Sequence, residues 1–308
     1  MAPLNIDYWR GFLFYQFNFI IDKLLILLKI QMTSLVHNYA KDDLSEDTSL
    51  WRYMDFTKFA DLILSKELYL RRIDSFFDPF EGQYSEITLS RFRDFLTQLY
   101  QNNPTVNIDE MVEQQVILWR IGKLETYVNC WHINEYESAG MWDLYAKTEE
   151  AIAVKTNIKK LKLCLEEATR PDPNATIYID KVFYIDYEKE APISRHNNLG
   201  FVEHLFNKRK SFEHEKEFRI LYSSYELYDW NDKTGAGTIN VQRVQEREKN
   251  NDELYKSRVL PIDVKELITE IYVSPTAPPW FYEMTKKFMK SMGLEDIPCI
   301  QSKLYSLK

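Results

Sequence analysis

Apolar and polar positions along the chain switch several times between a strand-like and a helix-like spacing. Alternation with a period of two predicts strands, and recurrence every three or four residues predicts helices. The predicted strands are 50–55, 68–73, 125–131, 151–155, 177–186, 217–222, 258–264, 270–273 and 298–301. The predicted helices are 57–65, 85–99, 108–121, 138–145, 158–167, 199–210 and 279–292. Since the two kinds of element interleave irregularly and no repeat is visible, we expect an α+β fold.

The patterned region, residues 50–308, is expected to form a single α+β domain. Its centre would be a largely antiparallel β-sheet or a split β-sandwich flanked by helices. Residues 226–251 are charged and contain glycines, which predicts a long surface loop or an insertion. Residues 32–49 are mostly polar and predict a linker into the domain.

The segment 1–31 is apolar for much of its length, and we expect an N-terminal apolar helix or an extension. Asp22, Lys23 and Lys29 interrupt it, whereas a membrane span usually needs ~20 nearly uncharged apolar residues. No small-residue cleavage site follows, which argues against a signal peptide. A docked helix, a membrane-associated helix and an extension upstream of Met32 all stay open. We favour the docked or dispensable helix and expect no stable membrane insertion.

Composition and charge exclude several classes of protein. The 308 residues include only 8 glycines, and Gly235-Ala236-Gly237 is not a dinucleotide-binding or P-loop motif. The net charge of −8 argues against broad non-specific binding to duplex nucleic acid. The short basic clusters 71–72 and 208–210 are most simply solvated surface.

The chain has three cysteines, Cys130, Cys164 and Cys299, without C-x-x-C spacing. Neither a disulfide framework nor a structural zinc site is indicated. Reduced thiols in a cytoplasmic protein fit this pattern best.

Four short clusters place charged or hydrogen-bonding residues beside aromatic ones, at 50–56, 76–82, 129–145 and 213–221. Aromatic walls with a few fixed polar groups are typical of small-molecule sites. The clusters therefore predict a binding site, but they do not name a reaction.

The first two clusters each offer a structural and a functional interpretation. By alternation Arg52 points away from Trp51 and Tyr53, either into solvent or into a cleft where its guanidinium would hold a phosphate or carboxylate. Asp78 and Glu81 flank a proline turn, and we expect them chiefly to brace that loop.

The third cluster joins a strand to a helix. Ser138 is a candidate helix cap. Trp142 and Tyr145 lie on the helical face that would pack against the core, so packing alone would explain them. Cys130 and His132 share a strand face, but side chains two residues apart stand ~6–7 Å from each other, which argues against a catalytic pair.

In the fourth cluster Glu215, Glu217 and Arg219 alternate with apolar residues. Solvated alternation would explain them, and so would a carboxylate that stabilises positive charge in a transition state.

Taken together, the clusters resemble the bacterial and phage family catalogued as domain of unknown function 2971. The resemblance covers about residues 50–302. The matching motifs are Leu50-Trp51-Arg52-Tyr53, Asp78-Pro79-Phe80-Glu81, Cys130-Trp131-His132, Glu137-Ser138 through Met141-Trp142 to Tyr145, and Glu215 with Glu217-Phe218-Arg219. Phe77 stands where the family often has Asn, and His132 where many members have Ser.

The order of these motifs is also similar to that of ADP-ribosyltransferases, in which NAD lies in the cleft of a split β-sandwich. This resemblance implies Glu217, or Glu215, as the catalytic carboxylate and Arg52 as the anchor of the pyrophosphate or ribose. Ser138 or Tyr145 would flank the nicotinamide. We add Tyr53, Trp142 and Arg219 as candidate contacts of the cofactor.

The leading hypothesis is therefore an NAD-dependent ADP-ribosyltransferase-like enzyme of toxin or antiphage type, with NAD as its substrate and no metal. A protein or a nucleic acid would be the acceptor. The alternative is a non-catalytic module that binds a nucleotide or a phage component. The third is a metal-dependent nuclease with Asp78, Glu81, Glu215 and Glu217 as ligands. The acceptor, the trigger and the oligomeric state are not determined by the sequence.

Overall fold

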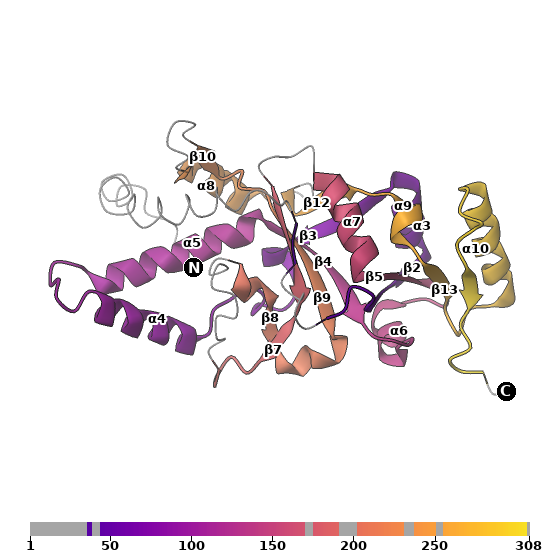
Figure 1. The fold of residues 1–308 in the computed structure, drawn as a ribbon, viewed down its shortest axis with the longest axis horizontal. Helices are drawn as coiled ribbons and strands as arrows, with labels where there is room; N and C mark the ends of the chain where they lie inside the picture. Colours follow the sequence, from indigo (N-terminus) through magenta and orange to yellow (C-terminus); the bar gives the residue numbers. More distant parts are fainter. Residues whose placement is uncertain are drawn as a thin grey trace.

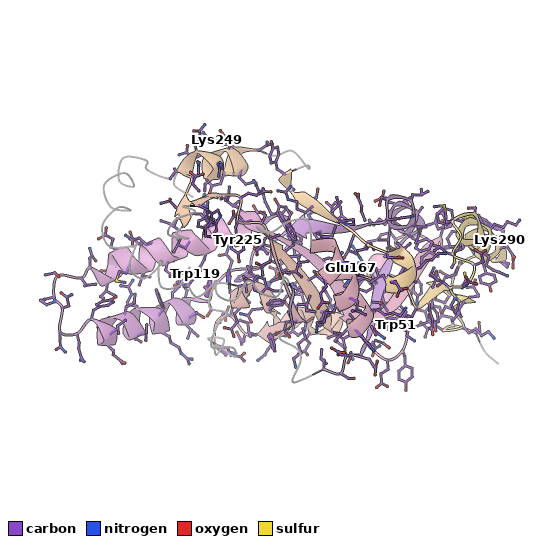
Figure 2. All side chains as sticks on the ribbon, turned by 45° about the horizontal axis from the view of Figure 1, so that its top comes forward. Trp51, Trp119, Glu167, Tyr225, Lys249 and Lys290 are labelled. Atoms are coloured by element: carbon purple, nitrogen blue, oxygen red, sulfur yellow. The ribbon has the colours of Figure 1, made fainter. Side chains whose placement is uncertain are left out.

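The computed structural model describes residues 36–38, 44–169, 175–190, 202–230, 237–250 and 255–306. A hairpin of two helices, α4 (Glu86–Leu99) and α5 (Ile108–Glu125), projects at one end, and α10 (Pro279–Ser291) lies at the other (Figure 1). Trp119 of α5 and Lys290 of α10 mark these two ends in Figure 2. The expected helix in residues 1–31 lies outside the described residues, as does half of the expected linker 32–49.

The central sheet is mixed but largely antiparallel, which confirms the expected α+β class. Its main path runs β1 (Val36–Asn38), β6 (Thr176–Lys181), β9 (Glu217–Ser223), β4 (Thr126–Ile133), β2 (Ser49–Asp55), β5 (Ala151–Asn157), β13 (Glu270–Val273) and β14 (Cys299–Gln301). A side branch adds β3 (Glu67–Arg72) and β12 (Ser257–Pro261). Among the described strands only β1–β6 and β13–β14 of this sheet pair in parallel.

The sheet divides at β4, and this division positions the candidate site. One edge of β4 pairs with β9 along its length. The other edge pairs with β3 at Tyr127 and Val128, and with β2 only at His132 and Ile133. Within the described residues no strand pairs with this edge between 129 and 131. We call this opening between β2 and β3 the fork; α3 (Phe56–Ser65) connects its two arms.

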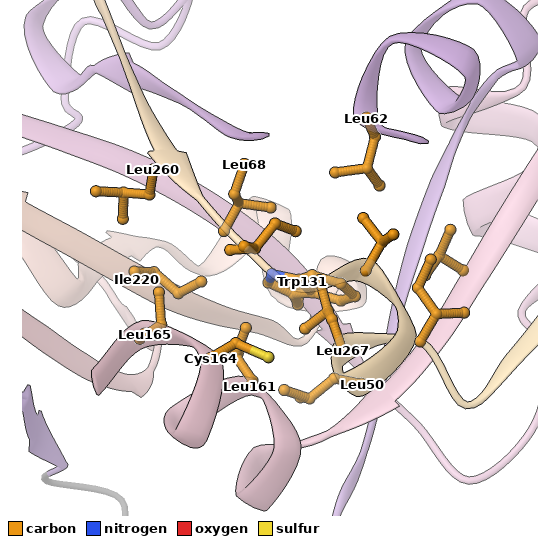
Figure 3. Packing of buried hydrophobic residues seen from close by; sticks show 14 of the residues in the cluster. Leu50, Leu62, Leu68, Trp131, Leu161, Cys164, Leu165, Ile220, Leu260 and Leu267 are labelled. Atoms are coloured by element: carbon orange, nitrogen blue, oxygen red, sulfur yellow. The ribbon is translucent and has the colours of Figure 1, made fainter. Parts of the chain in front are cut away.

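One face of the sheet carries the main hydrophobic core. Alternate residues of β4 and β9, among them Trp131, Phe218 and Ile220, pack under α3, α7 (Ile158–Thr169) and α9 (Val264–Leu267). Figure 3 shows Trp131 among buried side chains of these helices, such as Leu161 and Leu267, and of strands, such as Leu50 and Ile220. The opposite residues of β9, Glu217 and Arg219, therefore face the second side of the sheet.

The contribution of this core to the free energy of unfolding can be measured with a matched pair of valines. Val154 on β5 is fully buried, whereas Val259 on β12 is 48% exposed. Val154→Ala is expected to lower the free energy of unfolding by about 2–3 kcal/mol, because two buried carbons are lost and a cavity remains. Val259→Ala should change it by less than about 1 kcal/mol. Urea unfolding curves of the two variants check the difference, and equal losses would contradict the core assignment.

Most predicted elements are present within a few residues of their expected bounds, but three predictions were wrong. The helix expected at 199–210 is a 3₁₀ turn (Glu203–Phe206) followed by β8 (Asn207–Arg209), which pairs with β7 (Phe183–Ile185). The predicted strand 177–186 is interrupted and supplies both β6 and β7. Asp55 caps α3, since its carboxylate accepts a hydrogen bond from Lys58 N.

The third error concerns residues 226–251, which do not form a plain loop. Their described part contains the hairpin of β10 (Tyr228–Trp230) and β11 (Gly237–Ile239), followed by α8 (Val241–Lys249). Val244 packs on Ile121 and Leu124 of α5. Tertiary packing against α5 therefore orders a segment whose local composition favours a loop.

No helix in the described part of the chain has the length and apolar character needed to cross a membrane.

Candidate functional site

A cavity of about 930 Å³ opens at the fork. Its walls come from both arms, from the middle of β4, and from the loop 76–82, α6 (Ala139–Tyr145), β8 and the 3₁₀-helix η4 (Lys210–Glu215). The volume lies in the upper part of the range for small-molecule sites. Seven of the predicted site residues line it, namely Arg52, Tyr53, Asp78, Glu81, Tyr145, Glu215 and Glu217. Three others, Ser138, Trp142 and Arg219, are not among its lining residues.

Five charged side chains form the polar floor of the cavity, and we call them the ion cluster: Glu81, Lys208, Glu215, Glu217 and Arg219. Glu217 Oε1 accepts from Lys208 Nζ at 2.5 Å, and its Oε2 accepts from Arg219 Nε at 2.7 Å. Glu215 Oε2 accepts from the same lysine at 2.8 Å. All five are buried, so of the two interpretations of Glu215, Glu217 and Arg219 the solvated face is wrong.

The two neighbouring carboxyl groups differ in their affinity for a proton. Burial and a hydrogen bond with Glu217 raise the pKa of Glu215 to about 7. Burial alone would also raise the pKa of Glu217, but Arg219 and Lys208 outweigh it and hold that pKa below its usual value. Near neutral pH Glu217 is therefore ionised, while Glu215 is present in both its protonated and its ionised form. Different pKa values in adjacent carboxyl groups are a common arrangement for acid–base chemistry.

Arg219 lies beneath the cavity and not in its wall. Its side chain is 0% exposed, and it also donates to Glu81 Oε2 at 2.9 Å and to Leu205 O at 2.8 Å. With its donors engaged, Arg219 holds Glu81 and Glu217 in place. The expected contact between Arg219 and a cofactor is not supported by this position.

The loop 76–82 is braced as expected at Asp78 but not at Glu81. Asp78 accepts from Phe80 N at 3.1 Å and pairs with Arg209 at 3.0 Å. Glu81 instead turns inward to the ion cluster, where it pairs with Arg219. Gly82 has a φ of +65°, and a Cβ there would meet the Leu205 side chain at 3.0 Å. The loop thus needs glycine at 82 and contributes a carboxylate to the site.

Arg52 extends into the fork, on the face of β2 that also carries Leu50 and Met54. Trp51 and Tyr53 pack on the opposite face, in agreement with the predicted alternation. The guanidinium is half-buried, and within the described residues no carboxylate pairs with it and no hydrogen bond satisfies it. Burial lowers the pKa of Arg52 to about 10, so the group remains a cation at neutral pH.

Aromatic side chains form the remaining walls. Tyr145 OH donates to Glu215 Oε2 at 3.3 Å, and the Tyr53 ring meets His132 edge-on. Phe77 lines the mouth and is 102% exposed. Phe77 therefore places an apolar ring at the entrance of the cavity.

Ser138 and Trp142 support the wall from behind. Ser138 caps α6 by accepting from Met141 N, and its own N–H donates to Tyr53 OH at 2.9 Å. Trp142 is buried and donates to Glu137. The structural interpretation of these two residues therefore fits their positions, and they act on the cavity through Tyr53.

Cys130 and His132 do not form a reactive pair. His132 Nδ1 lies 2.6 Å from Glu215 O, and because a carbonyl only accepts, Nδ1 carries the proton. Burial raises the pKa of the Cys130 thiol, which keeps it protonated. This histidine thus fixes the backbone of η4 beside Glu215.

Lys208 is the member of the ion cluster that the sequence did not reveal. It belongs to a run of three basic residues expected at the surface. Its ammonium lies among Glu81, Glu215 and Glu217, the place that a metal would need. In the described residues no group of three or more His, Cys, Asp or Glu side chains is arranged to hold a metal ion.

These features define an α+β protein with a nucleotide-sized cavity whose floor is a buried carboxylate pair. A family model described as "Protein of unknown function (DUF2971)" matches residues 141–220. This match supports the expected family, and it includes most of α6, all of β8 and the first part of β9. No curated protein and no solved structure matches the chain.

Proposed function

We propose that this protein is an NAD-dependent ADP-ribosyltransferase-like enzyme whose catalytic carboxyl groups are Glu217 and Glu215. The observation that carries the proposal is the buried carboxyl pair of Glu215 and Glu217, in one cavity with Arg52, a cation that pairs with no carboxylate among the described residues.

The charge of the ion cluster suits a cationic substrate. With Glu215 protonated, the carboxylates of Glu81 and Glu217 balance the cations Lys208 and Arg219. Ionisation of Glu215 leaves one negative charge in excess, in a buried site where it is poorly screened. The nicotinamide ring of NAD and the oxocarbenium-like ribose of the transition state both carry positive charge, so they would be stabilised there.

The reaction can be written with these groups. The bond from ribose C1′ to the nicotinamide nitrogen breaks, and its electron pair neutralises the pyridinium ring. Glu217, which Lys208 and Arg219 hold in its ionised form, stabilises the cationic ribose by its negative charge. An acceptor O–H or N–H then attacks C1′, and Glu215 takes the released proton.

The other half of the substrate would be held at the fork. Arg52 has a charge and donor groups that no described residue uses, which fits the pyrophosphate. Trp51, Tyr53 and Tyr145 line the cavity beside the carboxylates and offer ring faces to the nicotinamide.

The proposal is tested by incubating the full chain with NAD and measuring nicotinamide release, with and without EDTA. Turnover that EDTA does not abolish is expected. Absence of turnover in the presence of candidate protein and nucleic-acid acceptors, with NAD still bound, would favour the binding-module alternative. Cleavage of nucleic acid that requires Mg²⁺ would favour the nuclease.

The pH dependence of turnover follows from Glu215. As the proton acceptor it must be ionised, so the rate is expected to rise about tenfold per pH unit below about 7 and to level off above it. Glu215→Gln should remove this rise of the rate with pH, together with most of the activity. A rate that is independent of pH between 5 and 8 would contradict the assigned role.

A further inference from the structure

Lys208 is buried, although its place in a run of three basic residues predicts an exposed side chain. It lies on β8, a three-residue strand outside the main sheet, and is only 7% exposed. The next two basic residues point elsewhere: Arg209 pairs with Asp78, and Lys210 pairs with Glu190 at the surface. Lys208 alone among the three turns into the cavity wall, with its ammonium 4.8 Å from the centre of the Phe212 ring.

The contacts of the two carboxyl groups are unequal. Glu217 has two cations, Lys208 and Arg219. Within the described residues Glu215 has only one cation at ion-pair distance, which is Lys208. Loss of the lysine would therefore leave Glu217 paired, while Glu215 would face an ionised neighbour without a counter-charge.

We propose that Lys208 is a positioning residue: its ammonium holds the carboxyl groups of Glu215 and Glu217 together and sets the pH at which Glu215 gives up its proton. The part that concerns catalysis rests on the proposed function. The part that concerns the proton of Glu215 does not, because it can be measured without turnover.

The other groups that face Glu215 do not account for its titration near neutral pH. Tyr145 donates to it from α6, and burial raises the pKa of that phenol. His132 contacts its backbone from β4, and burial lowers the pKa of that imidazole. Both are therefore neutral in this range. The charged neighbours are Glu217, Arg219 and Glu81, and each keeps a partner when Lys208 is removed.

The expected result of Lys208→Met is that Glu215 titrates at a pH at least about one unit higher, because the counter-charge is lost and the repulsion by Glu217 remains. Turnover at pH 6 should then fall by about tenfold or more relative to the wild type. Lys208→Arg keeps the charge and should stay within about half a unit. Lys210→Met, an exposed lysine two residues away, is the matched control and should change neither quantity.

The measurement is ¹³C NMR of side-chain-labelled glutamate in the full chain, with Glu215→Gln used to assign the resonance. If Lys208→Met does not fold, Lys208→Gln takes its place, because glutamine keeps polar contacts without the charge. Glu215 should titrate at a higher pH in this variant as well. Unchanged titration of Glu215 in a folded Met or Gln variant would overturn the inference. If the wild type fails to consume NAD, the proposed function fails, and the titration still tests Lys208.

Discussion

Replacing Glu217 with glutamine is expected to lower NAD turnover by about 10²–10³-fold per folded molecule. Glutamine keeps the size of the side chain but removes the charge that would stabilise the cationic ribose. Because Glu217 is buried between Lys208 and Arg219, the same change should also lower the free energy of unfolding, by about 3–5 kcal/mol at most. Turnover and thermal melting must therefore be measured on the same preparation, well below the melting midpoint.

Glu213→Gln is the matched control for this variant. Glu213 lies on η4, close in sequence to Glu217, but is exposed and does not line the cavity. Both turnover and stability should stay near the wild type. If Glu217→Gln turned over NAD at the wild-type rate, Glu217 would be a structural ion-pair partner and the proposed chemistry would lose its main group.

The second large effect is expected at Arg52, where binding and stability should move in different directions. Arg52→Gln should weaken the binding of NAD or ADP-ribose by about 10–100-fold, since a charge-assisted hydrogen bond contributes about 1.5–3 kcal/mol. The unliganded protein should not lose stability and should gain up to about 1–2 kcal/mol, because the change removes a half-buried cation that has no ion-pair partner among the described residues.

Calorimetric titration and urea unfolding of the same variant separate these two quantities. Arg91→Gln, at an exposed position of α4 away from the cavity, is expected to change neither. A variant at Arg52 that binds normally but unfolds more easily would show that the guanidinium has a structural partner and is not an anchor for an anion.

The sequence predicted much of the fold because most elements carry a local signal. The strand at 270–273 and the helix capped by Ser138 appear where alternation and capping placed them. The sequence also placed Arg52, Tyr145 and Glu217 in one site, and all three line the cavity. Each of them is a polar residue among apolar or aromatic neighbours, which is a departure from simple core patterning.

The missed features depend on contacts that are remote in sequence. Lys208 is buried because carboxylates at positions 81, 215 and 217 converge on it, and a run of basic residues contains no sign of that. The three-residue strand β8 exists because it pairs with β7, more than twenty residues earlier. Arg219 was assigned to the cofactor because it shares a face with Glu217, but its complete burial followed only from the packing of Leu205 and Glu81 around it.

At the fork, the reactive groups and the width of the opening depend on different residues, whereas many enzymes combine both properties in the same residues. The ion cluster belongs to β8, β9, η4 and the loop 76–82, whereas the breadth of the opening is set by β2 and β3 and by the helix α3 that joins them. Leu62 of α3 both lines the cavity and packs in the main core, so its volume affects the width of the opening without touching a carboxylate. Substitutions in α3 can therefore change which molecules enter the cavity while the ion cluster stays the same. Chains that share the ion cluster can differ in selectivity through this helix without a change in their reactive groups.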